Sequence, residues 1–320
     1  MNFLAIAIIA LLFASACSLK QHEAKDDSQY FAFAYFTYDN PDAGIRMALS
    51  RDGYHWKKLN KYDGHFVPVK NGLGNISDCP SIVKGSDGYY HMVWSTELSF
   101  IGYAKSKDLQ NWEDARKIDI SGGELGKPKA VWAPELFLDP QTKKYSIIFT
   151  AFTKKIPGLK NGHKGNHKAF VISTTDFKKF TQPKKLLNPD PKIYYIDPYV
   201  LFDKDTYYTF LKVEAHNTKD GEKDGLHYTK SPHLFGPHQR LSATLDRATG
   251  DAEGPTVMRL KDHWLMLYDT GFNRRGALAS NDLKLWIDVT DEVEFPEGYR
   301  HGTAIKIDAA LYRDLEQQFR

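Results

Sequence analysis

The segment "IGYAKSKDLQNW" (101–112) recurs along the chain and decides the fold. It combines a short alternating strand pattern, a Ser or Thr, a polar turn and, in most copies, an aromatic residue. Four similar segments are "IRMALSRDGYHW" (45–56), "AFVISTTDFKKF" (169–180), "LHYTKSPHLFGP" (226–237) and "GALASNDLKLW" (276–286). They follow one another about every 50 to 65 residues, and self-similarity at a fixed period is typical of repeat folds.

A second repeated pattern precedes four of these segments and predicts β-hairpins. Its copies are "SIVKGSDGYYHMVWS" (81–95), "LFLDPQTKKYSIIFT" (136–150), "YVLFDKDTYYTFLK" (199–212) and "TVMRLKDHWLMLYD" (256–269). Each has two apolar runs around turn residues. A unit of three or four strands cannot bury both faces of its sheet alone, but units arranged radially bury one another. We therefore predict an all-β, five-bladed β-propeller. A two-sheet sandwich would explain the strands but not their recurrence.

The two ends of the chain supply the remaining elements. The strand "FAFAYFTY" (31–38) precedes the first repeat, so we expect the N-terminal unit to complete the ring beside the last blade. The stretch "DAALYRDLEQQF" (308–319) predicts a short helix. No linker separates the units, so residues 30–320 are expected to form one monomeric domain.

The N-terminal 17 residues, "MNFLAIAIIALLFASAC", are expected to be a signal for export. The apolar run is too short to span a bilayer and ends in small residues. The ending "ASAC" resembles a bacterial lipobox, which implies a lipidated Cys17 and attachment through a lipid anchor in the periplasm or outer membrane. Ordinary cleavage after Ala16 is the alternative. Residues 18–29 are polar and are expected to form a tether.

Composition and cysteine content exclude several other classes of protein. The formal net charge is only +3 and no basic helix is present, so we do not expect a nucleic-acid partner. From Tyr30 onward, Cys79 is the single cysteine of the domain. An intrachain disulfide and a cysteine-based zinc site are therefore excluded.

Carboxylates stand at the predicted entrances of the innermost strands. "ISDCPSIV" contains Asp78, "YYIDPYVLF" contains Asp197 and "AEGPTVM" contains Glu253, each close to a proline, while "VWAPELF" carries Glu135 after its proline. In a propeller these positions converge around one end of the central channel. Carboxylates that converge raise one another's proton affinity, which suits paired acid and base catalysis on a glycosidic bond. A calcium site is the alternative for such a cluster.

As an ordered set, these motifs resemble glycoside hydrolase family 43, five-bladed propeller enzymes that act on arabinofuranosyl, xylosyl and galactofuranosyl linkages. The resemblance covers about residues 31–307 and also includes "DGYYHMVWST" and "RHGTAIKI". It implies that Glu253 is the general acid and that Asp197 tunes the pKa and orientation of that acid. It further implies inversion of the anomeric carbon, for which base and acid stand about 6.5 to 9.5 Å apart.

The predicted general base departs from the family pattern. Members of the family commonly read Asp-Pro-Ser, whereas this chain reads Asp78-Cys79-Pro80-Ser81. Aligned on the proline, Cys79 takes the place of the family's aspartate; aligned on the acid, one residue is inserted. A one-residue slip turns a strand side chain to the other face, and a local bulge can restore it. We take Asp78 as the expected base. A glycan-binding propeller with a degenerate base is the alternative.

Six further residues are candidates for substrate binding: Trp94, Trp132, Glu135, Lys212, Arg275 and His301. The two tryptophans can stack on a sugar ring or belong to the core. His301 matches a family motif near the channel axis, where a histidine helps to hold a water or cation; a hydrogen-bonded strand-end histidine is the alternative. Lys212 and Arg275 follow strands that are expected to end toward the same face. We expect no cofactor, although the resemblance leaves room for a structural calcium in the channel.

These expectations combine into one functional hypothesis. The resemblance implies an exo-acting glycoside hydrolase that removes terminal furanosyl residues, α-L-arabinofuranosyl in the first place, from polysaccharide side chains. A β-D-galactofuranosidase or a β-xylosidase on the same scaffold is the alternative enzyme. The sugar rests on the resemblance alone, whereas the fold rests on the repeat.

Overall fold

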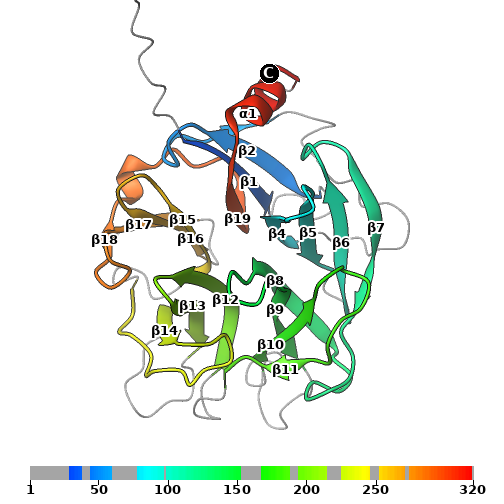
Figure 1. Cartoon of the computed structure of the whole chain (residues 1–320). Coiled ribbons are helices and arrows are strands. Elements are labelled where there is room, and N and C mark those ends of the chain that lie inside the picture. The colour runs from blue at the N-terminus through cyan, green and yellow to red at the C-terminus, as the bar shows by residue number, and fades with distance from the viewer. Residues whose placement is uncertain are drawn as a thin grey trace, which may run out of the picture.

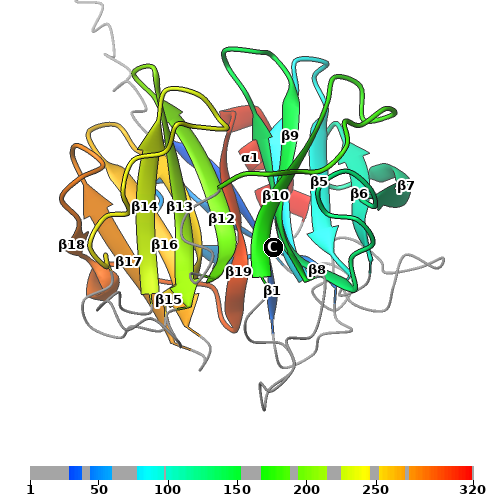
Figure 2. The same ribbon diagram turned by 90° about the horizontal axis from the view of Figure 1, so that it is seen from below.

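The chain forms five antiparallel β-sheets arranged around a central axis (Figure 1). The computed structural model describes residues 29–37, 44–59, 78–96, 99–152, 167–187, 194–214, 225–245, 252–270 and 274–318. This arrangement confirms the predicted five-bladed β-propeller. Figure 2 shows the same blades from the side.

We number the blades in the order of their position around the axis. Blade 1 contains β19 (Tyr299–Ile307), β1 (Tyr30–Thr37), β2 (Arg46–Ser50) and β3 (Lys57–Lys58). Blade 2 contains β4 (Asp78–Lys84), β5 (Tyr90–Ser95), β6 (Phe100–Ser106) and β7 (Trp112–Asp119). Blade 3 contains β8 (Ala130–Leu138), β9 (Tyr145–Phe152), β10 (His167–Thr174) and β11 (Lys184–Lys185). Blade 4 contains β12 (Tyr194–Asp203), β13 (Thr206–Glu214) and β14 (Gly225–Ser231). Blade 5 contains β15 (Ala252–Arg259), β16 (Trp264–Thr270), β17 (Arg275–Ser280) and β18 (Ile287–Asp288).

The two ends of the chain meet in blade 1 and close the ring. The C-terminal strand β19 is the innermost strand and pairs with β1, with Tyr30 opposite Ile307. The N-terminal unit therefore does complete the ring, but it takes its inner strand from the C-terminus. The predicted helix follows as α1 (Ala309–Gln318), and Tyr312 packs against Tyr30 with ring centroids 4.8 Å apart. In the part of the chain that the structure describes, no helix has the length and apolarity to cross a membrane.

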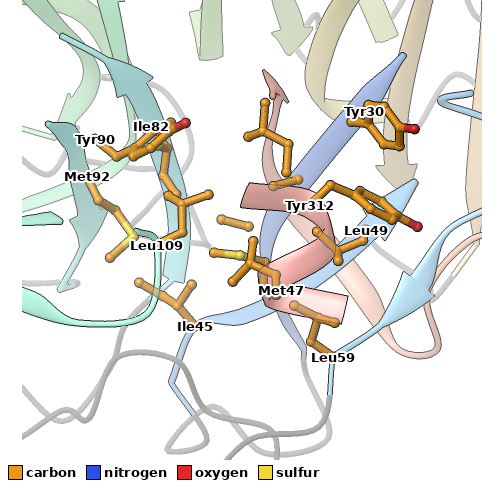
Figure 3. Packing of buried hydrophobic residues seen from close by; sticks show 14 of the residues in the cluster. Tyr30, Ile45, Met47, Leu49, Leu59, Ile82, Tyr90, Met92, Leu109 and Tyr312 are labelled. Carbon is orange, nitrogen blue, oxygen red and sulfur yellow. The ribbon is translucent and has the colours of Figure 1, made fainter. Parts of the chain in front are cut away.

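Hydrophobic side chains fill the spaces between neighbouring blades. Figure 3 shows one such cluster, in which Met47 and Leu49 of blade 1 lie with Ile82 and Met92 of blade 2. Tyr312 of α1 belongs to the same cluster. Each blade thus removes the apolar surface of the next from water, which is the main favourable contribution to folding. This burial explains why the repeat cannot be stable as a single unit.

The repeated turn seen in the sequence is held by one hydrogen-bond pattern. Ser106 Oγ donates to Asp108 Oδ1, and that carboxylate accepts the backbone N–H groups of Gln110 and Asn111. Equivalent Ser or Thr to Asp bonds join Ser50 to Asp52, Thr174 to Asp176 and Ser280 to Asp282. Side chains of these types satisfy turn backbone locally, which is why the motif recurs at the same place in the blade.

A bulge at the start of the innermost strand recurs in four blades. Strands β4, β8, β12 and β15 each shift register by one residue against their hairpin partner, beside a proline. The residue before that proline has a positive φ in each case: Cys79 (48°), Ala133 (46°), Asp197 (52°) and Gly254 (62°). Bulges of this kind bend a strand and redirect its side chains, and they are common beside active sites. Here they shape one end of the channel.

The central channel beyond the bulges contains a buried carboxyl group. Glu135 lines a cavity of about 310 Å³ between the inner strands, together with Tyr199 and Thr303. The Thr303 hydroxyl donates to Glu135 Oε2 at 3.3 Å. Burial raises the pKa of Glu135 to about 8, although hydrogen bonds from Ser81 and Thr303 oppose the shift. The side chain is therefore a neutral acid at neutral pH, placed along the axis and past the strand entrance.

Glu135 should make stability depend on pH. Its pKa is 4.5 in a solvated chain and about 8 in the fold, so the folded protein holds a proton that the unfolded chain loses between these values. The neutral carboxyl group of Glu135 contributes to the free energy of unfolding in full below about pH 4.5, and this contribution falls as pH rises toward 8. Glu135→Gln, which stays neutral, should raise Tm at about pH 8 by at least about 2 °C, with a smaller gain at about pH 5.

Thermal melts of the wild type, Glu135→Gln and Glu113→Gln across this pH range measure the effect. Glu113 is the control because its side chain is 59% exposed. If the Tm difference between Glu135→Gln and the wild type does not change with pH, this explanation is wrong.

Candidate active site

The shared bulge makes residues of different blades structurally equivalent. In each of the four blades, one residue pair is the last before the register shift. These pairs are Asp78 with Ser95, Trp132 with Thr150, Ile196 with Lys212, and Glu253 with Asp269. Asp78 therefore occupies the position of Glu253 within its blade, and Cys79 occupies the position of Asp197. Aligned by structure, the thiol stands where the family pattern places an aspartate.

Glu253 lies between two cations that come from the neighbouring blades. Its Oε2 accepts from Lys212 Nζ of β13 at 2.8 Å, and its Oε1 accepts from Arg300 Nη2 of β19 at 2.9 Å. The glutamate side chain is 18% exposed, which leaves it accessible from the channel end. Ion pairs held on both oxygens fix the carboxyl group in one orientation. Sequence reasoning placed Glu253 and Lys212 in the site but did not pair them.

Arg300 connects Glu253 to a further carboxylate, Asp269. Its Nε donates to Asp269 Oδ2 at 3.2 Å and its Nη1 donates to the Thr270 carbonyl at 3.3 Å. Asp269 is fully buried and also accepts the backbone N–H of His301 at 2.6 Å. Burial raises the pKa of Asp269 above its usual range, although Arg300 opposes the shift. Neither Asp269 nor Arg300 was identified as a site residue from the sequence.

Asp197 occupies the bulge beside Glu253. Its Oδ2 accepts the backbone N–H of Gly254 at 3.0 Å, and its own N–H donates to the Thr150 hydroxyl at 3.2 Å. Burial, and next the negative charge of Glu253, raise the pKa of Asp197 well above its usual range. This arrangement links the aspartate directly to the backbone that carries Glu253. The two neighbouring carboxyl groups therefore differ in their partners, because Asp197 accepts a backbone N–H whereas Glu253 is bound by two cations.

His301 covers the bulge from the other side. Its Nδ1 lies 3.9 Å from Asp197 Oδ2. A Cβ atom at position 254 would come within 2.6 Å of the imidazole, and Gly254 also has a positive φ, so both contact and backbone require glycine there. Burial, and next the charge of Arg300, lower the pKa of His301 to about 3. The imidazole is therefore neutral and packs against the entrance of β15.

Cys79 lies close to the carboxylates but lacks the chemistry of a base. The residue as a whole is partly buried. Burial, and next the charges of Asp78 and Asp197, raise the pKa of the thiol well above its usual value. A protonated thiol does not accept a proton from water at neutral pH. The neighbouring carboxylate, Asp78, stands at the position from which Glu253 reaches the channel end in blade 5.

The two candidate tryptophans have different surroundings. Trp132 shares the strand position of Glu253 and packs edge-on against His167, with ring centroids 5.3 Å apart. His167 Nδ1 is 3.0 Å from Glu214 Oε2. Trp94 is only 1% exposed and lies in the core, and a Cβ at Gly102 would come within 2.1 Å of its indole ring. The core alternative therefore applies to Trp94, because no face of the indole is open to a sugar.

Two other candidates have different partners, although Arg275 stands opposite Asp269 in the ladder between β16 and β17. Glu135 faces the channel interior, past the bulge. Arg275 donates to the Tyr299 carbonyl at 3.1 Å and lines a separate cavity of about 520 Å³ beside the 3-10 helix Thr290–Glu292. None of the described residues lining that cavity is a carboxylate of the cluster. Arg275 therefore contributes to this second cavity.

No group of three or more His, Cys, Asp and Glu side chains within the described ranges is arranged to hold a metal ion. Neutral His301, packed on Gly254, is placed for contact with protein groups.

The structure does not describe the N-terminal segment. The predicted leader 1–17, the lipidation site Cys17 and nearly all of the tether 18–29 lie outside the described residues.

Solved structures with the same fold come from several glycosidases. An α-L-arabinofuranosidase from Lactobacillus brevis is 17% identical, with a TM-score of 0.56 over 72% of this chain and 90% of that one. An endo-1,4-β-xylanase from Bacteroides thetaiotaomicron is 16% identical, with a TM-score of 0.58 over 87% and 94%. An exo-β-1,3-galactanase from Clostridium thermocellum is 17% identical, with a TM-score of 0.52 over 68% and 50%. At these identities the likeness concerns the fold.

The sequence itself assigns the family. No curated protein matches the chain. A family model described as a probable glycosyl hydrolase domain, related to glycoside hydrolase family 43, matches residues 26–313. Together with the five blades and the carboxylates at their inner ends, this match shows that the chain belongs to the family of probable glycosyl hydrolases related to glycoside hydrolase family 43.

Proposed function

We propose that this glycoside hydrolase removes terminal furanosyl residues, α-L-arabinofuranosyl in the first place, from polysaccharide side chains with inversion. The observation that supports it best is the position of Glu253, fixed at the channel end by Lys212 and Arg300 beside a buried Asp197. Family membership supports cleavage of a glycosidic bond. The choice of sugar follows the motif resemblance described above.

In the proposed reaction, Glu253 donates a proton to the glycosidic oxygen as the bond to the anomeric carbon breaks. Asp78 accepts a proton from the water that attacks the opposite face. Asp197 holds the backbone of Gly254 and thereby the orientation of the acid. As the proton leaves, negative charge develops on Glu253, and the cations Lys212 and Arg300 stabilise it.

Two alternatives have specific support. The endo-1,4-β-xylanase among the structures of similar fold favours testing β-xylosides beside arabinofuranosides. The motif resemblance adds β-D-galactofuranosides to the set of substrates. The protonated thiol of Cys79, at the position equivalent to Asp197, favours a glycan-binding protein without hydrolytic activity. Turnover of any aryl glycoside separates the enzyme from the binder, and the glycoside that is cleaved identifies the sugar.

The location of the protein is part of the proposal. We infer that the protein is exported and anchored through a lipid on Cys17, since residues 1–17 form an apolar segment that ends in small residues and a cysteine. Such an anchor would hold the propeller outside the cytoplasm, where polysaccharide substrates are found. Mass spectrometry of the mature N-terminus tests the lipid.

Glu253→Gln should abolish general-acid catalysis while preserving the size of the side chain. We expect kcat on an aryl α-L-arabinofuranoside with a poor leaving group to fall by about 100-fold or more. A substrate with a good leaving group, which needs little protonation, should lose far less. Proton NMR of the first product should show the inverted anomer. An equal loss on both substrates would contradict the role of Glu253 as the acid.

Asp78→Asn and Cys79→Asp together test the general base. If Asp78 accepts the proton, Asp78→Asn should lower kcat by about 100-fold or more on both kinds of leaving group. Cys79→Asp places an aspartate at the position equivalent to Asp197, and we expect it to leave the rate unchanged or lower. Cys79→Ser is the matched control. A large gain in Cys79→Asp, or in a chain from which Cys79 is deleted, would show that Asp78 is poorly placed.

A further inference from the structure

A patch of positive charge covers one end of blade 3. It consists of six exposed lysines from the turn before β9, the turn after β10 and the outer strand β11: Lys143, Lys144, Lys178, Lys179, Lys184 and Lys185. Within the described part of the chain, none of these six forms an ion pair. The carboxylates beside them, Asp139, Asp176 and Glu124, accept hydrogen bonds from backbone N–H groups. This lysine patch is therefore available to an anionic partner.

The lysine patch lies at the end of the blade opposite the carboxylate cluster. Strand β8 carries Trp132 at its entrance, beside the shared bulge, and ends at Leu138, just before the turn that contains Lys143 and Lys144. A strand rises about 3.3 Å per residue, so the nine residues of β8 separate its two ends by roughly 25 Å. A ligand on the lysine patch therefore does not occupy the candidate active site.

A groove of about 340 Å³ opens beside the lysine patch, between blades 3 and 4. Lys144 and Lys184 belong to both the patch and the groove, and Phe235, which follows β14, lines the groove from blade 4. A volume of this size lies in the range of sites that hold small molecules. The groove can thus hold a sugar ring, with two ammonium groups beside it.

The lining of the groove combines an open aromatic ring with oriented polar groups. Phe235 is 49% exposed, and it is the aromatic member of the three large hydrophobic side chains that are exposed among the described residues. The buried Tyr207 hydroxyl donates to Asp139 Oδ1 at 2.8 Å and to Gln141 Oε1 at 3.1 Å. The Gln141 amide is therefore held in place through its oxygen, which leaves its NH₂ group to donate to a ligand.

We propose that the groove and the lysine patch form a second glycan-binding site, which takes a polysaccharide that bears uronate carboxylates. Phe235 offers a flat face for the C–H side of a sugar ring, Gln141 a donor for its hydroxyls, and the lysines charges for its carboxylates. An anionic membrane surface would use the lysines and Phe235, but it would leave the groove and its fixed amide without a role. The site goes beyond the proposed function and does not depend on hydrolysis.

Binding of polygalacturonate to the full chain tests this site, with its fully methyl-esterified form as the uncharged comparison. We expect binding at low ionic strength that salt weakens, and much weaker binding of the ester. Lys144→Gln/Lys184→Gln should raise Kd about 5-fold or more, because two charges at the groove are lost. Phe235→Ala should raise Kd for polygalacturonate about 3-fold or more.

The control is Lys57→Gln/Lys58→Gln, which removes two lysines from β3, the equivalent outer strand of blade 1, and should leave Kd unchanged. Equal binding of the acid and its ester, or an equal loss in the groove variant and the control, would overturn the inference. So would binding to vesicles of phosphatidylglycerol and phosphatidylcholine without binding to polygalacturonate.

Hydrolysis of an aryl furanoside separates this inference from the proposed function. The groove variants should keep the wild-type kcat, because the site lies at the other end of the blade. Binding that follows the lysines in a protein that cleaves no glycoside would retain the second site and reject the proposed hydrolysis. Cleavage without any binding of polygalacturonate would do the reverse.

Discussion

The bulge before a proline, repeated at the inner end of four strands, is the constraint on which the site depends. It places one residue at positive φ and shifts the register of the strand by one residue. In blade 5 the residue at positive φ is Gly254, which also makes room for His301. In blade 4 it is Asp197, whose carboxylate then reaches the Gly254 N–H. One backbone distortion thus brings side chains of separate blades into a single cluster.

The carboxyl groups of this cluster differ in their electrostatic surroundings. Glu253 has a cation on each oxygen, Asp197 is bound to backbone amide, and Asp269 is buried against Arg300. Because carboxyl groups in different surroundings hold protons with different strength, a single cluster can provide both an acid and a base. The unusual member is Cys79, whose neutral thiol stands at the strand position that Asp197 has in blade 4.

Sequence reasoning succeeded where the pattern is local and repeated. The alternating strands, the Ser-x-Asp turns and their period predicted the five blades, and the pattern of residues 308–319 predicted the C-terminal helix. Sequence reasoning could not predict which residues stand opposite each other in neighbouring strands. Counting back from Arg259 opposite Trp264 would place Thr270 opposite Glu253, but the bulge moves the register by one residue and brings Asp269 there instead. No sequence period records that shift.

By itself, the sequence determined the blade repeat, because strand alternation and turn chemistry depend on residues close together in the chain. It also determined which residue types stand at the strand entrances. Only the tertiary structure decided their partners: Trp94 became core by packing on Gly102, Arg275 was directed to another opening, and Lys212 and Arg300 from two other strands met on Glu253. These outcomes depend on closure of the ring and on its bulges, which bring together residues that are far apart in the chain.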